Sequence, residues 1–213
     1  MLPLFVVMLH LLSQGVLAQL QRRPYYCSEV QQCYSFVSMC RSSDYETRIY
    51  EPSMWIGTFI ASNEQSYQAI ARLKEYFHKK NEPGIQLERT APILTTFRNI
   101  NGLPRETAVY SMVPRRYFTN PPAPRDTAVF LKRFPPMAMF VKSYEGWFFN
   151  QRRISEKLYE SLLREGEQFQ WDRFYTARYN SPLTFLNRHT EVWYLARGTP
   201  KCSSRYRRPY LLV

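Results

Sequence analysis

The fold is decided by residues 45–80, which read YETRIYEPSMWIGTFIASNEQSYQAIARLKEYFHKK. In residues 45–50 aromatic and β-branched residues alternate with polar ones, and this period of two predicts a strand. Residues 54–60 are rich in aromatic and β-branched residues, which predicts a second strand. The period changes at residue 64. The sequence therefore predicts two adjacent strands that are followed directly by a helix.

The predicted helix covers residues 64–80, where apolar residues return every three or four positions. Ile70, Leu73 and Phe77 fall on one stripe, which we expect to pack against a sheet. Asn63 is the predicted N-cap, because its short side chain can accept a hydrogen bond from the first turn. We therefore expect an amphipathic helix with one buried side.

The same order of elements occurs again further along the chain. Ile154, Leu158 and Leu162 recur every four residues and predict a second helix at 151–165. Further strands are predicted at residues 85–97, 107–113, 128–134, 137–144, 174–179 and 191–197. This repetition favours an α+β domain of two similar halves, with an antiparallel sheet and two helices.

Residues 1–18 have the pattern of a secretory signal peptide. They contain no Lys, Arg, Asp or Glu, and Val16 and Ala18 occupy the −3 and −1 positions of a cleavage site. An uncleaved anchor is the alternative, but the apolar run is short for a membrane span. No later segment is apolar enough to cross a bilayer, so we expect a secreted, extracellular protein with no transmembrane segment.

Four cysteines, Cys27, Cys33, Cys40 and Cys202, form an even set. In an oxidising compartment such a set predicts two disulfides, and the sequence leaves all three pairings open. Their spacings differ from the CxxC patterns of redox and zinc sites, which favours a structural role. Three of the four lie near the N-terminus, so full pairing requires a bridge to the C-terminal tail.

The chain of 213 residues carries 29 Lys and Arg against 17 Asp and Glu, a formal net charge of +12. This excess favours anionic partners. No nucleic-acid-binding motif accompanies the arginine pairs, so we expect no nucleic acid, and favour weak contact with an acidic glycan or acidic protein. The sequence also lacks the G-x-S-x-G, P-loop, HExxH and dinucleotide-binding motifs, and we expect no enzyme activity.

Several segments resemble segments of the SOUL/heme-binding protein family and occur in the same order along the chain. They are YETRIYEPSMW at 45–55, TAP at 90–92, NPPAP at 120–124, MAMFVKSYEG at 137–146, YTARYNSP at 175–182 and LNRHTEVW at 186–193. The resemblance implies a distorted antiparallel β-barrel with two helices and pseudo-twofold duplicated halves. The implied fold is also similar to that of bacterial effector-binding domains, which hold hydrophobic small molecules between such halves.

With this resemblance the chain divides into four parts. We expect a signal peptide at 1–18, a Cys-bearing extension at 19–44, the SOUL-like heme-binding domain at 45–198 and a basic tail at 199–213. The extension and the tail carry all four cysteines. We therefore expect a disulfide to cross-link the extension and the tail outside the barrel.

The resemblance implies binding of heme or another tetrapyrrole in an apolar cleft beside the first helix. There, Lys74 would pair with a propionate, and Tyr67, Ile70 and Ala71 would contact the ring. His78 shares this side of the helix and is a candidate iron ligand, with a solvated role near the helix C-terminus as the alternative. The leading expectation is a secreted, non-enzymatic binding protein for a tetrapyrrole.

One position departs from the family pattern. Members credited with an axial histidine carry it where this chain has Ile49, which cannot ligate iron. The sequence therefore implies loose apolar binding of the ring rather than tight iron coordination. Two alternatives remain open: an interaction protein that has lost heme binding and uses its basic surface, and an enzyme with Glu88 or Glu191 aimed into the cleft.

Overall fold

The structure is a computed structural model that describes residues 24–100, 103–145, 150–181, 184 and 188–202. The predicted signal peptide and most of the predicted basic tail lie outside these residues. The α-helices described are α2 (Ser66–Phe77) and α3 (Gln151–Arg164). The strands are β1 (Gln32–Cys33), β2 (Phe36–Arg41), β3 (Glu46–Tyr50), β4 (Ser53–Phe59), β5 (Thr90–Ala91), β6 (Ile93–Ile100), β7 (Leu103–Met112), β8 (Val129–Phe134), β9 (Met137–Glu145), β10 (Arg173–Arg178) and β11 (His189–Leu195).

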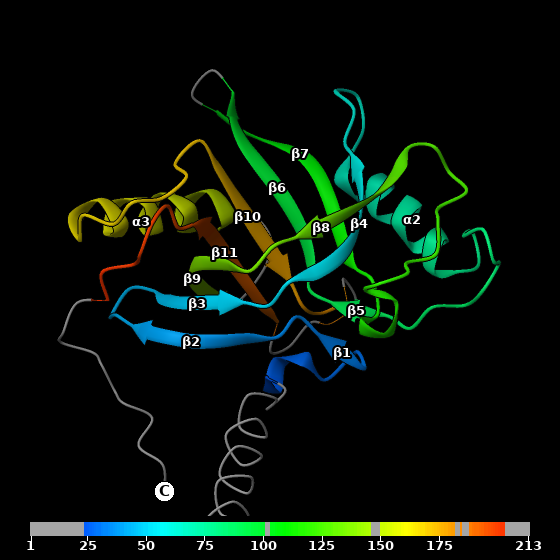
Figure 1. Ribbon diagram of the computed structural model, residues 1–213. Coiled ribbons are helices and arrows are strands. Elements are labelled where there is room, and N and C mark those ends of the chain that lie inside the picture. Colours follow the sequence, from blue (N-terminus) through cyan, green and yellow to red (C-terminus); the bar gives the residue numbers. More distant parts are fainter. Residues whose placement is uncertain (1–23, 101–102, 146–149, 182–183, 185–187, 203–213) are drawn as a thin grey trace, which may run out of the picture.

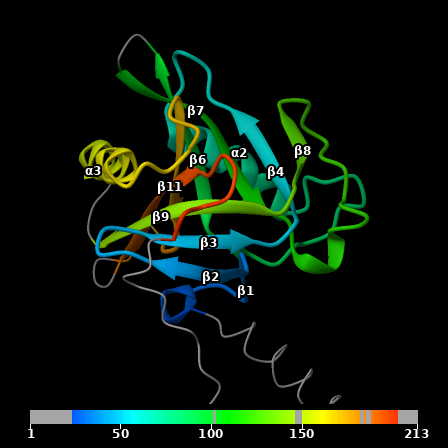
Figure 2. The same ribbon diagram turned by 60° about the vertical axis from the view of Figure 1, so that its left-hand side comes forward.

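Nine strands form one antiparallel sheet in the order β2-β3-β9-β11-β10-β6-β7-β4-β8. The sheet curls into a half-barrel, with α2 and α3 on either side of the central β6–β10 pair (Figure 1, Figure 2). A separate short parallel pair joins β1 to β5. The predicted α+β fold, a distorted barrel with two helices, is confirmed. Within the described residues, no helix combines the length and apolar character that a membrane span needs.

The two predicted halves are visible in the topology. One unit is β3-β4-α2-β6-β7 and the other is β8-β9-α3-β10-β11, so both run strand, strand, helix, strand, strand. The units meet at the β6–β10 pair. The first strand of each unit pairs with the second strand of the other, since β3 pairs with β9 and β8 pairs with β4. α2 packs on β4 and β7, and α3 packs on the equivalent strands β9 and β11. This arrangement confirms the pseudo-twofold prediction.

Two local predictions are wrong. Asn63 is not the N-cap of α2, because Gln65 occupies that position and forms a reciprocal capping box with Gln68. The strand predicted at 85–97 begins only at Thr90, since residues 85–89 form a loop that follows the helix. Asn81 anchors this loop by donating to the carbonyl of Ile85 at 2.8 Å and accepting from its amide.

The segment before residue 45 is part of the domain, which the sequence analysis did not expect. β2 pairs with β3 along the sheet edge. Tyr26, Val30 and Tyr34 are buried in the inner core, where the Tyr34 ring lies 5.2 Å from the ring of Trp55. The expectation that the N-terminal extension lies outside the barrel is therefore corrected, because its apolar residues complete the core.

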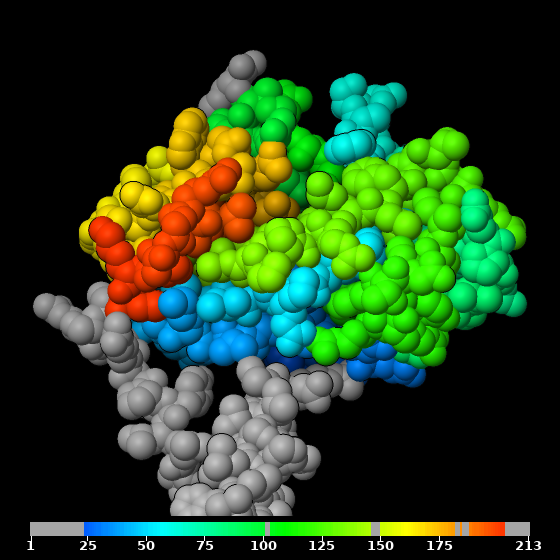
Figure 3. Space-filling model, in the orientation of Figure 1, coloured from blue at the N-terminus to red at the C-terminus, as the bar shows by residue number. Residues whose placement is uncertain are grey.

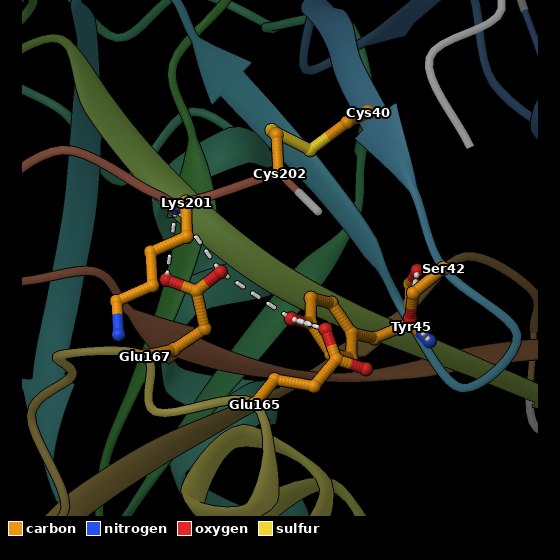
Figure 4. Close-up of a disulfide and its surroundings, with 7 residues drawn as sticks. All are labelled: Cys40, Ser42, Tyr45, Glu165, Glu167, Lys201 and Cys202. Carbon is orange, nitrogen blue, oxygen red and sulfur yellow. Dashed lines mark hydrogen bonds between the residues drawn. A yellow bond between two sulfur atoms is a disulfide. The ribbon is translucent and has the colours of Figure 1, made fainter. Parts of the chain in front are cut away.

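Two disulfides join Cys27 to Cys33 and Cys40 to Cys202. The second one confirms the predicted link between the N-terminal segment and the C-terminal tail. It holds the end of the described chain against β2 (Figure 4), and the segment after β11 lies between α3 and β2 at the surface (Figure 3). Glu167 accepts from the Lys201 amide at 3.1 Å and fixes the same segment.

Candidate ligand cavity beside helix α2

Helix α2 is fixed on the sheet by one buried side. Ala69, Leu73, Tyr76 and Phe77 are buried there among residues of β4 and β7. The Tyr76 hydroxyl donates to the carbonyl of Pro122 at 2.7 Å, which ties the end of the helix to the proline-rich loop. The helix is therefore held firmly enough to form the wall of a binding site.

A cavity of about 350 Å³ opens beside the C-terminal half of α2. This volume lies at the small end of the range for small-molecule sites. Its apolar wall consists of Val30, Ile70, Leu73, Phe77, Ala91, Ile93 and Tyr179. Helix, sheet and N-terminal segment thus all contribute to one apolar hollow.

The polar part of the wall is cationic. Lys74, Arg89 and Arg178 line the cavity, His78 lies at the end of the helix, and none of the described lining residues is Asp or Glu. Burial lowers the pKa of the Arg178 guanidinium, although Glu106 opposes this effect. A negative group in the cavity would be attracted by these side chains, so the geometry suits an apolar molecule that carries acidic groups.

Three of the five predicted binding residues line this cavity, namely Ile70, Lys74 and His78. Tyr67 and Ala71 are exposed and are not among the lining residues, and Tyr67 lies in the first turn of α2 whereas the cavity opens beside its C-terminal half. The binding roles of all five stay predictions. Arg89 and Arg178 also line the cavity and are not predicted from the sequence, and Arg178 reaches the site only through sheet pairing.

The N-terminal segment closes one side of the cavity. Val30 lines it, and the neighbouring Glu29 carboxylate accepts from the Ser181 amide at 2.7 Å, the Thr184 hydroxyl at 2.7 Å and the Asn180 side chain at 3.0 Å. Partial burial opposes ionisation, but these hydrogen bonds hold the pKa of Glu29 below its usual value. Glu29 therefore positions the wall formed by Asn180 and Ser181.

A buried polar network lies directly behind the cavity, around Glu191 in β11. Its carboxylate accepts from Arg48 at 2.9 Å, Trp193 at 2.8 Å and Tyr179 at 3.0 Å, and lies 2.8 Å from the His189 Nε2. Burial opposes the charge, but Arg48 and these hydrogen bonds lower the pKa of Glu191 to about 2. Since Tyr179 also lines the cavity, the network supports its wall.

Two residues of the segments that resemble the SOUL/heme-binding protein family, Ile49 and His189, do not line the cavity. Ile49 lies on the exposed face of β3, opposite Val37 of β2 and Ala138 of β9. His189 is buried in β11 and stacks on Tyr26, with ring centroids 3.6 Å apart.

The two carboxylates considered for catalysis are also engaged elsewhere. Glu191 lies in the buried network, and Glu88 pairs with Arg116 at 3.1 Å and accepts from Gln32 at 2.9 Å. Neither lines the cavity. Within the part of the chain described, no three His, Cys, Asp or Glu side chains lie close enough to hold a metal ion.

The fold defines a class of proteins with two strand–strand–helix–strand–strand units in one curled sheet, here with a ligand-sized cavity beside the first helix. The profile described as SOUL heme-binding protein matches residues 31–195, and the chain belongs to that family. The match begins inside the N-terminal segment and so agrees with its place in the sheet.

Similar curated proteins are described as heme-binding proteins. Heme-binding protein 2 of Homo sapiens is 32% identical over 163 residues, which cover 73% of this chain and 80% of the relative. Heme-binding protein 1 of Mus musculus is 24% identical over 135 residues, which cover 62% of this chain and 71% of the relative.

Among solved structures, the C-terminal domain of EcmrR superposes with a TM-score of 0.57 at 9% identity. The alignment covers 76% of this chain and 99% of that domain. An uncharacterised conserved protein of Listeria innocua gives a TM-score of 0.51 at 12% identity, with coverage of 71% and 91%. At these identities the similarity shows the fold alone.

Proposed function

We propose that the cavity beside α2 binds heme or another tetrapyrrole, and that the protein is an exported binding protein rather than an enzyme. One observation carries the proposal: an apolar cavity whose charged lining residues are cationic, with no acidic residue among those described. Membership of the SOUL heme-binding protein family supports the same ligand class. A tetrapyrrole with propionates has the matching chemistry, a flat apolar body with carboxylates at one edge.

Each part of the cavity has a role in this proposal. Leu73, Phe77 and Tyr179 offer apolar surface to the macrocycle. Lys74 and Arg89 are exposed at the rim, where their charges attract the carboxylates. The volume of about 350 Å³ leaves part of so large a ring outside, which fits loose binding with one edge in solvent.

The iron is not the main source of affinity in this proposal. Ile49 cannot ligate a metal and is not among the residues that line the cavity, and His78 lies at the exposed end of α2. When bound, heme would supply an apolar ring and two carboxylates to these residues. We therefore expect iron-free protoporphyrin to bind about as tightly as hemin.

Export is supported by the cysteine chemistry. Two disulfides join all four cysteines of the chain. Such pairs persist in secretory and extracellular compartments and are rare in the cytosol. The charge-free apolar segment at 1–18 supports the same compartment, and mass spectrometry of protein from a eukaryotic culture medium tests it by detecting an N-terminus at Gln19.

A ligand titration tests the binding proposal. Hemin and protoporphyrin are added to the oxidised full chain while absorbance is recorded, for the wild type and Lys74→Glu. We expect saturable binding of both ligands, and about tenfold weaker binding for Lys74→Glu, because charge reversal removes an attraction and adds a repulsion. Lys157→Glu, exposed on α3, is the matched control and should bind as the wild type does. Absence of saturable binding by the wild type would overturn the proposal.

A further inference from the structure

Three arginines lie in one row across neighbouring strands, at the opposite ends of these strands from the cavity. Arg98 of β6 is directly opposite Arg173 of β10 on one side and Arg105 of β7 on the other. Directly opposite residues of antiparallel strands project to the same face of a sheet, so the three guanidinium groups share a face. The three strands run side by side in the centre of the sheet (Figure 1).

The row has no counter-charge among the described residues. None of the three side chains forms an ion pair there. The Nε of Arg173 is buried and has no hydrogen-bond partner in the same part of the chain. Glu106 follows Arg105 directly, but it is paired with Phe97, one position away from the row. Like charges directly opposite destabilise a sheet, so the row imposes a cost that folding alone does not explain.

The surroundings of the row offer apolar contact beside the charge. Tyr175 follows Arg173 by two positions, on the same face of β10, and is only partly buried. Arg105 also lines a second hollow of about 290 Å³, together with Phe97, Phe174 and Arg152. Tyr175 thus places an aromatic ring beside the cationic row, whereas Phe97 and Phe174 are buried and project to the other face of the sheet.

We propose that Arg98, Arg105 and Arg173 bind a sulfated polysaccharide of the heparin type. Neighbouring strands lie about 4.8 Å apart, so the row extends over roughly 10 Å and matches a line of anionic groups better than one small ion. Guanidinium groups form paired hydrogen bonds to oxoanions, which suits sulfate and carboxylate. The two disulfides favour an oxidising compartment, where polyanions are polysaccharides rather than nucleic acids. This site is separate from the α2 cavity and does not depend on its ligand.

Binding to immobilised heparin tests the proposal with the oxidised full chain. Arg98→Thr/Arg105→Thr is compared with Arg153→Ala/Lys157→Ala, which removes two exposed charges from α3 and leaves the row intact. We expect the row variant to bind about five- to tenfold more weakly and to elute at lower salt, since exposed charged contacts each contribute modestly. The α3 variant should elute close to the wild type. Equal losses in both variants would show that only net charge matters and would overturn the proposal.

Two further measurements distinguish polysaccharide binding from a purely structural role of the arginines and from DNA binding. The row variant should keep or raise the thermal midpoint, by about 1–3 °C, because it relieves repulsion within the sheet. A lower midpoint would mean that the arginines stabilise the fold, which contradicts a binding role. Double-stranded DNA at the same salt should bind more weakly than heparin, and tighter DNA binding that the row variant abolishes would overturn the polysaccharide assignment.

Discussion

The Tyr179 hydroxyl donates a hydrogen bond to the buried carboxylate of Glu191 at 3.0 Å, while the Tyr179 side chain lines the cavity beside α2. One residue therefore connects the candidate binding site to the polar network inside the half-barrel. Glu191 is fully buried, and Arg48 supplies the opposite charge at 2.9 Å. The stability of the network and the shape of the cavity should depend on each other.

Tyr179→Phe should separate these two contributions. The substitution removes the hydroxyl from a buried carboxylate but keeps the apolar ring, so we expect a loss of about 1–2 kcal/mol in the free energy of unfolding. Porphyrin affinity should stay within about twofold. Urea denaturation measures the first effect, and absorbance titration the second. Tyr175→Phe is the control, since its hydroxyl forms no hydrogen bond within the described residues, and a similar loss there would contradict the role of Glu191.

The ionisation of Glu191 predicts a pH dependence of stability. Its pKa falls from 4.5 to about 2 in the folded state, so the ionised carboxylate stabilises the fold above pH 4.5 and this contribution is lost as the pH falls towards 2. The contribution is on the order of 3 kcal/mol. Urea unfolding at pH 7, 5 and 3 measures it. Glu191→Gln should be less stable at pH 7 and should lose less stability on acidification, and parallel pH profiles for the two proteins would refute this assignment.

The two disulfides should differ in their effect on stability. Cys40–Cys202 closes a separation of 162 residues and Cys27–Cys33 one of 6. In the chain-entropy model these bridges contribute about 5 and about 2 kcal/mol, respectively. Replacing each pair by serine and measuring urea unfolding tests the difference. Equal losses, or a larger loss for the short bridge, would show that the long bridge does not act mainly on the unfolded chain.

The sequence predicts a site residue well when it lies on an element with a regular period. Ile70 and Lys74 are four residues apart, so the helical repeat places both on one side of α2, and both line the cavity. Arg178 is different, because it meets this helix only after β10 has paired with β6. Residues brought together by strand pairing across a long loop leave no local pattern in the sequence.

The same limit applies to the N-terminal segment and to the arginine row. Tyr26 and Tyr34 belong to the extension that the sequence places outside the barrel, but they are core residues because they fill an apolar gap that the sheet leaves. Arg98 and Arg173 are far apart in sequence and come to lie directly opposite each other only in the folded sheet. The number of halves and helices could be predicted from the repeated order of elements, whereas the register could not.

Locating the bound porphyrin shows whether the cavity beside α2 is its binding site. Methyl NMR spectra of the oxidised protein, recorded during titration with iron-free protoporphyrin, report which side chains lie near the ring. We expect large ring-current shifts for Ile70, Leu73 and Val30, which line the cavity, and none for Ile49 and Val37 on the exposed face of the sheet edge. Shifts confined to Ile49 and Val37, with the cavity methyl groups unchanged, would contradict it.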